Sequence, residues 1–159
     1  LIGFRNQFLT DTKGNGIMNH VFAGWGAYKG DIPGRTRGSL VAFEAGTTTA
    51  YGIDKCQARG TMYVNPGEEV YEGEIVGENS REDDMDVNPC KKKHVSNMRA
   101  AGSDDAVRLV PPQTFSLEGA LEHINDDETV EVTPKSIRMR KKILSRMERA
   151  RTRARNARA

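Results

Sequence analysis

Hydrophobic residues near the start of the chain follow first a helical and then an extended spacing. Within residues 1–9 they fall at positions 1, 4 and 8, which is the spacing of one helix face. Residues 17–25 are rich in side chains that favour strands, and the Asp, Asn and Gly residues between the two segments predict a turn. Residues 26–38 are rich in glycine and predict a linker, with a domain boundary near Asp31.

The middle of the chain carries short β-rich runs that are separated by turn residues. The predicted strands are residues 40–43, 50–53, 60–64, 70–78, 86–87 and 106–110. Between two of them, Pro66 and Gly67 predict a tight turn, because proline fixes φ at the first corner and glycine accepts the second. Short strands at such regular spacing predict a small antiparallel sheet or barrel.

Helical signals return toward the end of the chain. Ser116 is a suitable N-cap, and hydrophobic residues after it recur at helical spacing. Thr133 and Pro134 suit the start of a second helix, whereas the alternation over residues 137–140 suits a strand, and both interpretations stay open. Residues 149–155 favour a helix but have no large hydrophobic side chain to bury, so we expect them to be frayed until a partner neutralises them.

Composition places the chain among small globular proteins. It has 159 residues, of which 36% are hydrophobic, and a net charge of +2, which suits one or two small domains. No hydrophobic run approaches the roughly 20 residues that cross a membrane, and residues 1–4 lack the order of a signal peptide. We expect a monomeric, cytoplasmic protein with no membrane partner. Because residue 1 is Leu and a helical spacing is already under way there, we also expect a fragment of a longer protein.

Charge is distributed unevenly along the chain. Residues 115–132 carry six acidic side chains and no Lys or Arg, whereas residues 135–159 carry eleven basic side chains and one acid, Glu148. Residues 91–93 add three consecutive lysines. Such asymmetry is typical of contact with a polyanion such as nucleic acid, although a solvated charged helix would show it too.

Few residues have the spacing that catalysis or metal binding requires. The chain has no Gly-x-x-x-x-Gly-Lys-Ser/Thr sequence to cradle the phosphates of a nucleotide. The three histidines are widely separated from one another, and the two cysteines share no Cys-x-x-Cys spacing, so no set of zinc ligands is indicated. Acidic residues 82–86 lack the glycine and the terminal glutamate of a calcium loop, so a solvated acidic turn is favoured over a metal-dependent enzyme. We therefore predict no catalytic residue, no metal site and no cofactor in this chain.

The strongest candidate for function is the loop with the sequence VNPCKKKHVSNMRAAGSDD, residues 87–105. Its cations would repel one another unless they were solvated or bound to phosphate. The alternative is an exposed hairpin whose lysines pair with residues 82–86, where each surface pair contributes at most about 1 kcal/mol. The candidate RNA-binding residues in this loop and near residue 140 are Lys91, Lys92, Lys93, His94, Asn97, Arg99, Ser103, Arg138, Arg140, Lys141 and Lys142.

Several longer stretches of the chain resemble one protein family. They include LIGFRNQFLTDTKGNGIMNHVF, VYEGEIVGENSR, SNMRAAGSDDAVRLVPP, LEGALEHINDDETVEVTP and SIRMRKK. These stretches run through almost the whole chain. They resemble the C-terminal part of the BipA family, also called TypA, whose members are ribosome-associated translational GTPases.

This resemblance implies a domain organisation. Residues 1–30 would be the closing helix and strand of a ferredoxin-like domain similar to domain V of elongation factor G. Residues 31–147 would form the family's own C-terminal domain, with a long loop at about residues 80–105, and residues 148–159 would be a basic tail. The implied fold class is α+β, with a mostly antiparallel small sheet or barrel and one or two packed helices.

The resemblance also implies a function. In the family this domain reaches the ribosomal A site, where its loop approaches the acceptor end of tRNA and the peptidyl-transferase region. Lys93 and His94 stand where many relatives have a pair of lysines, and the residues that match the family's NMR-x-x-G pattern are Asn97, Met98, Arg99 and Gly102. The implied partners are ribosomal RNA, the acceptor end of A-site tRNA and ribosomal proteins. GTP and Mg²⁺ would bind to other domains of the parent protein, which would carry the GTPase activity.

We therefore expect a ribosome- and RNA-docking region that has no catalysis of its own. Its residues 83–103 would be mobile until the ribosome orders them. The alternative is a protein-interaction module that offers its acidic residues 115–132 to a basic ribosomal protein. Roles in ribosome assembly and in translation under stress both stay open.

Overall fold

The structure of the chain, a computed structural model, describes residues 4–28, 30, 34–93 and 108–156. The helices in this part of the chain are α1 (Phe4–Asp11), α2 (Ala50–Gln57), α3 (Leu117–His123) and α4 (Arg146–Asn156). The strands are β1 (Ser39–Ala42), β2 (Gly46–Thr47), β3 (Gly60–Met62), β4 (Glu69–Val70), β5 (Ile75–Asn79), β6 (Met85–Val87), β7 (Glu128–Val132) and β8 (Ile137–Lys141). The predicted α+β class is confirmed.

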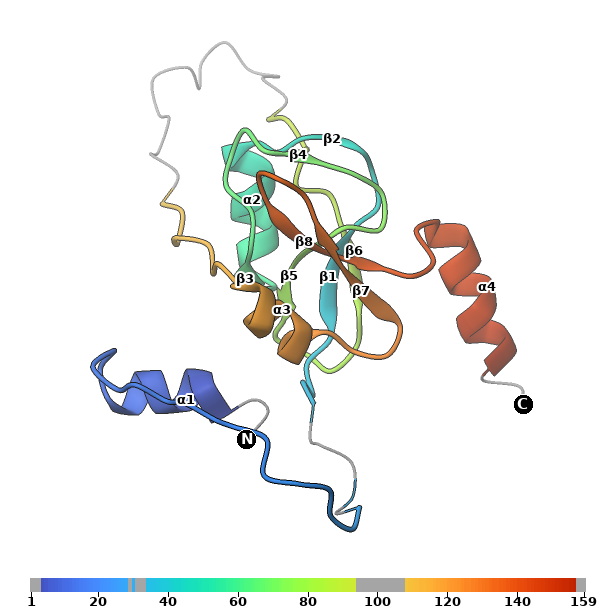
Figure 1. The fold of residues 1–159 in the computed structure, drawn as a ribbon. Helices are drawn as coiled ribbons and strands as arrows, with labels where there is room; N and C mark the ends of the chain where they lie inside the picture. The colour runs from blue at the N-terminus through green and yellow to red at the C-terminus, as the bar shows by residue number, and fades with distance from the viewer. Residues whose placement is uncertain (1–3, 29, 31–33, 94–107, 157–159) are drawn as a thin grey trace.

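The centre of the fold is a four-stranded sheet in the order β3-β5-β1-β6 (Figure 1). Strand β1 pairs antiparallel with β5 and parallel with β6, so the sheet is mixed. Strands β2 and β4 form a two-stranded sheet of their own, and β7 and β8 form an antiparallel hairpin. The described strands build open sheets and do not close into a barrel.

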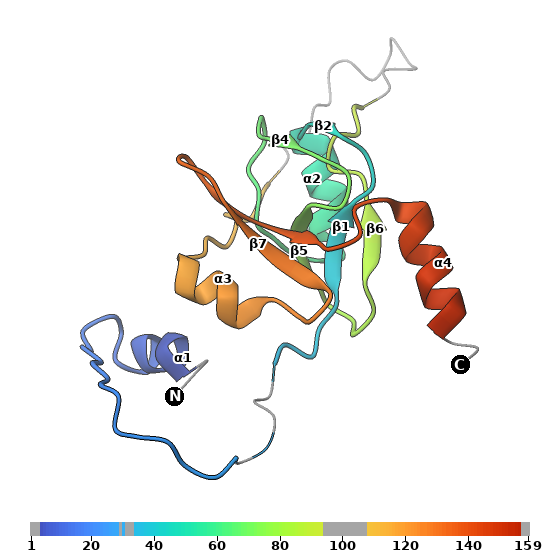
Figure 2. The same cartoon turned by 45° about the vertical axis from the view of Figure 1, so that its right-hand side comes forward.

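The central sheet is covered on both faces, because successive side chains of a strand point to opposite sides. Val76 of β5 packs in one hydrophobic cluster with Ile53 and Cys56 of α2. Its neighbour Ile75 packs in a second cluster with residues of α3 and β8. Figures 1 and 2 show α2 on one side of the sheet and the β7–β8 hairpin with α3 on the other. This burial on both faces explains why β1 has the sequence SLVA, with all four residues buried.

Helix α2 replaces a strand that the sequence predicts at residues 50–53. The Oγ1 atom of Thr49 accepts a hydrogen bond from the Gly52 N–H at 2.9 Å, which makes Thr49 the N-cap of a helix. Ile53 and Cys56, three residues apart, both face the core, as a helix requires. The strand prediction is therefore wrong, because a four-residue hydrophobic run does not distinguish a strand from a buried helix turn.

Most other predicted elements are found, and two are not. Strands β1, β3 and β6 and the Ser116 N-cap lie where the sequence predicts them, and β8 selects the strand interpretation of residues 137–140. The long strand predicted over residues 70–78 is divided into β4 and β5 around Gly73, whose φ is +89°. Residues 17–25 and 108–110 form no strand, because no strand of the described chain pairs with them. Residues 106 and 107 lie outside the described part.

The basic C-terminal segment is more ordered than predicted. Residues 146–156 form helix α4, which lies beside the edge strand β6 (Figures 1 and 2). The side chain that it buries is an arginine, Arg149, which is 6% exposed. Among the described residues, no helix is both long and apolar enough to cross a membrane.

Candidate nucleic-acid interface

The first residue of the lysine segment, residues 91–93, lies next to the N-terminal end of α2 in space. Thr49 donates from its N–H to the Pro89 carbonyl at 3.0 Å and from its hydroxyl to the Lys91 carbonyl at 2.6 Å. Gly52 makes this approach possible, since a Cβ atom there would lie 2.1 Å from the Pro89 oxygen. The backbone that leads into the lysines is therefore fixed to the first turn of a capped helix.

The chain returns to the same helix at its other end. Gln57, the last residue of α2, donates to the Arg108 carbonyl at 2.9 Å and accepts from the Val110 N–H at 3.2 Å. Leu109 between them packs against the core. Helix α2 has eight residues and is therefore about 12 Å long. Its two ends hold the backbone at positions 91 and 108, so these positions are separated by about the length of the helix.

Three lysine side chains are exposed on this support, while other predicted contacts lie outside the described residues. Lys91, Lys92 and Lys93 are all exposed. Within the described part of the chain, Lys91 and Lys92 form no ion pair with the acidic residues 82–86, which disfavours the alternative of a paired hairpin for these two lysines. The predicted contact residues outside the described ranges are His94, Asn97, Arg99 and Ser103. The predicted mobility over residues 83–103 is contradicted for its first part, because residues 85–87 form β6.

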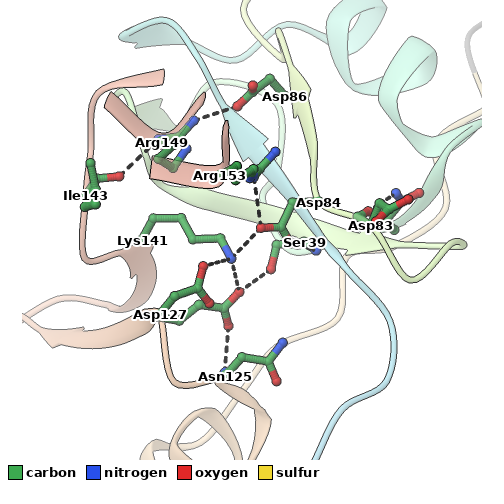
Figure 3. Close-up of polar contacts among 12 residues, drawn as sticks. Ser39, Asp83, Asp84, Asp86, Asn125, Asp127, Lys141, Ile143, Arg149 and Arg153 are labelled. Carbon is green, nitrogen blue, oxygen red and sulfur yellow. Dashed lines mark hydrogen bonds and ion pairs between the residues drawn. The ribbon is translucent and has the colours of Figure 1, made fainter. Parts of the chain in front are cut away.

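Lys141 is a predicted RNA contact that the structure places in the interior. It is 1% exposed, and its Nζ atom lies 2.7 Å from Asp84, 2.8 Å from Asp127 and 2.9 Å from Glu128 (Figure 3). Burial disfavours the charged amine, but the hydrogen bonds to these carboxylates outweigh it and raise the pKa of Lys141. The three carboxylates engage the amine and its burial keeps it from solvent, which argues against the predicted RNA contact of Lys141.

Glu128 lies at the centre of this cluster and stays ionised. Burial would raise its pKa, yet donors hold the pKa below its ordinary value: the Ser39 hydroxyl at 2.5 Å, the Asn125 N–H at 3.0 Å and Lys141. Arg35 adds a second cation at 2.8 Å. The cluster ties the β7–β8 hairpin to β1 and to the chain before β6, which is a structural role.

Acidic residues before and within β6 hold helix α4 in place. Arg149 donates to Asp86 at 2.6 Å and to the carbonyl of Ile143 at 3.3 Å, and Arg153 reaches Asp84 at 3.2 Å (Figure 3). Arg146 also pairs with Asp86, at 3.3 Å. These contacts account for Asp84 and Asp86 as partners of the helix. Among the described residues, no group of three or more His, Cys, Asp or Glu side chains could hold a metal ion.

Sequence reasoning missed this pairing between α4 and β6. The available signal is that arginines 146, 149 and 153 follow one helix face, while Asp84 and Asp86 follow one face of an extended chain. Their opposite charges make the two faces complementary. The pattern becomes informative only if the two segments are assumed to be neighbours.

The remaining predicted contacts lie on or after β8. Arg138 is partly exposed and pairs with Glu74 at 3.4 Å, Arg140 is half-buried, and Lys142 is exposed. Glu74 itself is buried, which raises its pKa to about 7 although Arg138 partly opposes the shift. Lys142 is therefore the most accessible of the predicted cations in this region.

These features define a small α+β domain that exposes cations at the support on α2 and on α4. Residues 37–146 match the model of the TypA/BipA C-terminal domain family, and the chain belongs to that family. It is 47% identical over 150 residues to the large ribosomal subunit assembly factor BipA of Bacillus subtilis, covering 94% of this chain and 24% of the relative.

Two further relatives extend this comparison. The large ribosomal subunit assembly factor BipA of Synechocystis is 45% identical over 141 residues, which are 89% of this chain and 24% of the relative. The putative elongation factor TypA-like SVR3, chloroplastic, of Arabidopsis thaliana is 49% identical over 139 residues, which are 87% of this chain and 20% of the relative. The chain thus spans about a quarter of the length of the curated relatives that it matches.

Proposed function

We propose that this chain docks a translational GTPase of the BipA family on the ribosome by binding RNA. The observation that carries the proposal is the exposed lysine segment on a support that α2 fixes at both ends. Phosphate contacts by lysine dominate the affinity of proteins for RNA and require no particular base sequence. The names of the bacterial relatives, large ribosomal subunit assembly factors, support the choice of the ribosome as the partner.

The fixed support favours tight binding by the lysines. Ordering a loop on binding costs free energy, and a backbone that is already held in place avoids part of this cost. The hydrogen bonds from Thr49 to Pro89 and Lys91 provide that order before RNA arrives. The lysines then contribute charge close to a position that the fold determines.

The proposal extends to finer contacts that follow from the family resemblance. The RNA would be ribosomal RNA or the acceptor end of tRNA in the A site, and Asn97 and Arg99 would add contacts beside the lysine segment. GTP and Mg²⁺ would bind to other domains of the parent protein, and this chain would contribute no catalytic group. Its role would be to position the parent on the large subunit.

The alternative function, binding of a basic ribosomal protein by acidic residues 115–132, has weaker support. Asp127 and Glu128 bind Lys141, Glu118 pairs with Arg5, and Glu131 accepts a hydrogen bond from a tyrosine hydroxyl. Within the segment, Glu122 and Asp126 form no ion pair with the described residues. Most of the acidic charge therefore serves the fold.

Co-sedimentation of the 159-residue chain with large ribosomal subunits at increasing salt tests the proposal. The variant Lys91→Ala/Lys92→Ala/Lys93→Ala should bind more weakly. Its plot of log affinity against log salt should be shallower, with a slope smaller in magnitude by about two to three. A matched control changes Arg59, Arg81 and Lys135 to Ala, three exposed cations that form no ion pair with described residues. Equal binding by both triple variants would exclude the lysine segment as the docking contact.

A further inference from the structure

Helix α4 carries its arginines on two opposite faces. Arg146, Arg149 and Arg153 form the inner face, which meets Asp84 and Asp86. Arg151 and Arg155 are four residues apart and lie about 120–160° around the helix from Arg149 and Arg153, at 100° per residue. Among the described residues, acidic side chains pair with the inner arginines and not with Arg151 or Arg155, so the two faces differ in net charge.

The inner face is what orders the helix. An isolated helix of this length is marginally stable in water, and α4 has 11 residues and no hydrophobic stripe. Arg149 supplies the missing contact, since its buried guanidinium binds Asp86 and the carbonyls of Ile143 and Leu144. Arg146 adds a contact at the start of the helix, where its guanidinium lies 5.1 Å from the centre of the Phe43 ring. The outer face is consequently held at a fixed orientation beside β6.

The outer face presents two exposed cations at a regular spacing. Arg151 and Arg155 are exposed, and neither forms an ion pair with the described residues. They are separated by four residues, or about 6 Å along the helix axis. The exposed residues beside them, Ala150 and Ala154, are small and allow a partner to approach closely. Glu148 is the single acid of the helix and offsets part of this charge.

We propose that Arg151 and Arg155 form a second contact with the RNA backbone, separate from the lysine segment. This inference rests on the proposed docking to the ribosome and adds a surface to it. Charge complementarity selects the occupant: arginine forks bind phosphate oxygens, and the outer face offers one large exposed hydrophobic side chain, Met147, to a protein partner. Figures 1 and 2 both show α4 apart from the N-terminal end of α2. The lysine segment and the outer face of α4 would therefore bind different parts of the RNA.

The test is co-sedimentation of the whole chain with large ribosomal subunits at increasing salt, using Arg151→Gln/Arg155→Gln. A matched variant, Arg59→Gln/Arg81→Gln, removes two exposed cations elsewhere. Far-UV circular dichroism checks that α4 stays folded in both. We expect only the α4 variant to bind more weakly than the wild type. Its slope of log affinity against log salt should be smaller in magnitude by about two.

A second arm repeats the titration with ribosomal RNA that has been stripped of protein. The α4 defect should persist there, because the contact is to phosphate. If the defect appears on intact subunits and vanishes on bare RNA, the face binds a ribosomal protein and the RNA assignment is overturned. If the wild type binds and both double variants match it, the α4 contact is overturned while the proposed function stands. If the wild type binds neither subunits nor RNA, the proposed function fails first.

Discussion

Replacement of Lys141 by methionine tests the reinterpretation of this residue as a buried structural cation. The substitution keeps a side chain of similar length but removes the charge between Asp84, Asp127 and Glu128. The side chain of Glu128 is 0% exposed, that of Asp84 is 17% exposed and that of Asp127 is 64% exposed. Water can therefore solvate Asp127 after the change, whereas Glu128 and much of Asp84 stay buried.

The expected loss follows from the partners that remain. Removal of one member of a buried ion pair typically destabilises a protein by about 3–5 kcal/mol. Arg35 still lies 2.8 Å from Glu128 and Arg153 still lies 3.2 Å from Asp84, so the lower end applies. We expect Lys141→Met to reduce the free energy of unfolding by about 3 kcal/mol at pH 7. Lys142→Met, the exposed neighbour, should change it by less than about 0.5 kcal/mol.

The pH dependence of this loss gives a sharper check. Despite burial, hydrogen bonds from Lys141 and from backbone and side-chain donors hold the pKa values of Asp84 and Glu128 below their ordinary 3.8 and 4.5. Their stabilising contribution is present above those values and is lost as the pH falls through the folded pKa values. The difference between wild type and Lys141→Met in urea unfolding should therefore shrink below about pH 4. A difference that is near zero at pH 7, or constant down to pH 3, would refute the reasoning.

Three further variants test other parts of the structure. The pKa of Glu74 is raised from 4.5 to about 7 in the fold, so the wild type should lose stability as the pH rises through this range. Glu74→Gln should remove about 3 kcal/mol of this loss in urea unfolding. Thr49→Val should reduce stability by about 1 kcal/mol through the lost N-cap, and should also weaken ribosome binding, whereas Ser116→Ala should reduce stability alone. Arg149→Gln should lower the helical circular-dichroism signal, because α4 loses its buried contact.

Each of these expectations has a contrary outcome. Parallel pH profiles for the wild type and Glu74→Gln would show that Glu74 does not titrate near neutrality. Equal ribosome binding by Thr49→Val and Ser116→Ala would show that the support on α2 does not matter to the lysines. An unchanged helical signal in Arg149→Gln would mean that α4 is stable without its contact to Asp86.

Local signals in the sequence predict elements well where the neighbouring residues decide the structure. Ser116 caps α3 with its own side chain, as predicted, whereas the alternation of Ile137 and Met139 with arginines left a helix and a strand open until β8 decided for the strand. Helix α2 escapes prediction because its short hydrophobic run also suits a strand, and the contact of Thr49 with Pro89, forty residues away, is not visible in the local sequence. Tertiary contacts of this kind override the preference of a short hydrophobic run.

The candidate site shows the same division between local and distant causes. The exposure of residues 91–93 follows from their composition, and the structure agrees with it. Lys141 looks like any other basic residue of its segment, although it shares a strand face with the buried Met139. Only the approach of Asp84, Asp127 and Glu128 turns it into a core residue. Charge alone therefore locates a basic surface but does not show which cations face solvent.

Photo-crosslinking from position 92 tests the central claim most directly. A benzoylphenylalanine in place of Lys92 would be irradiated with the chain bound to large ribosomal subunits, and the same group in place of Arg59 would serve as the control. The account predicts that position 92 crosslinks to RNA and that position 59 does so much less. Crosslinks from position 92 to ribosomal proteins alone would contradict the proposal that the lysine segment docks the chain on RNA.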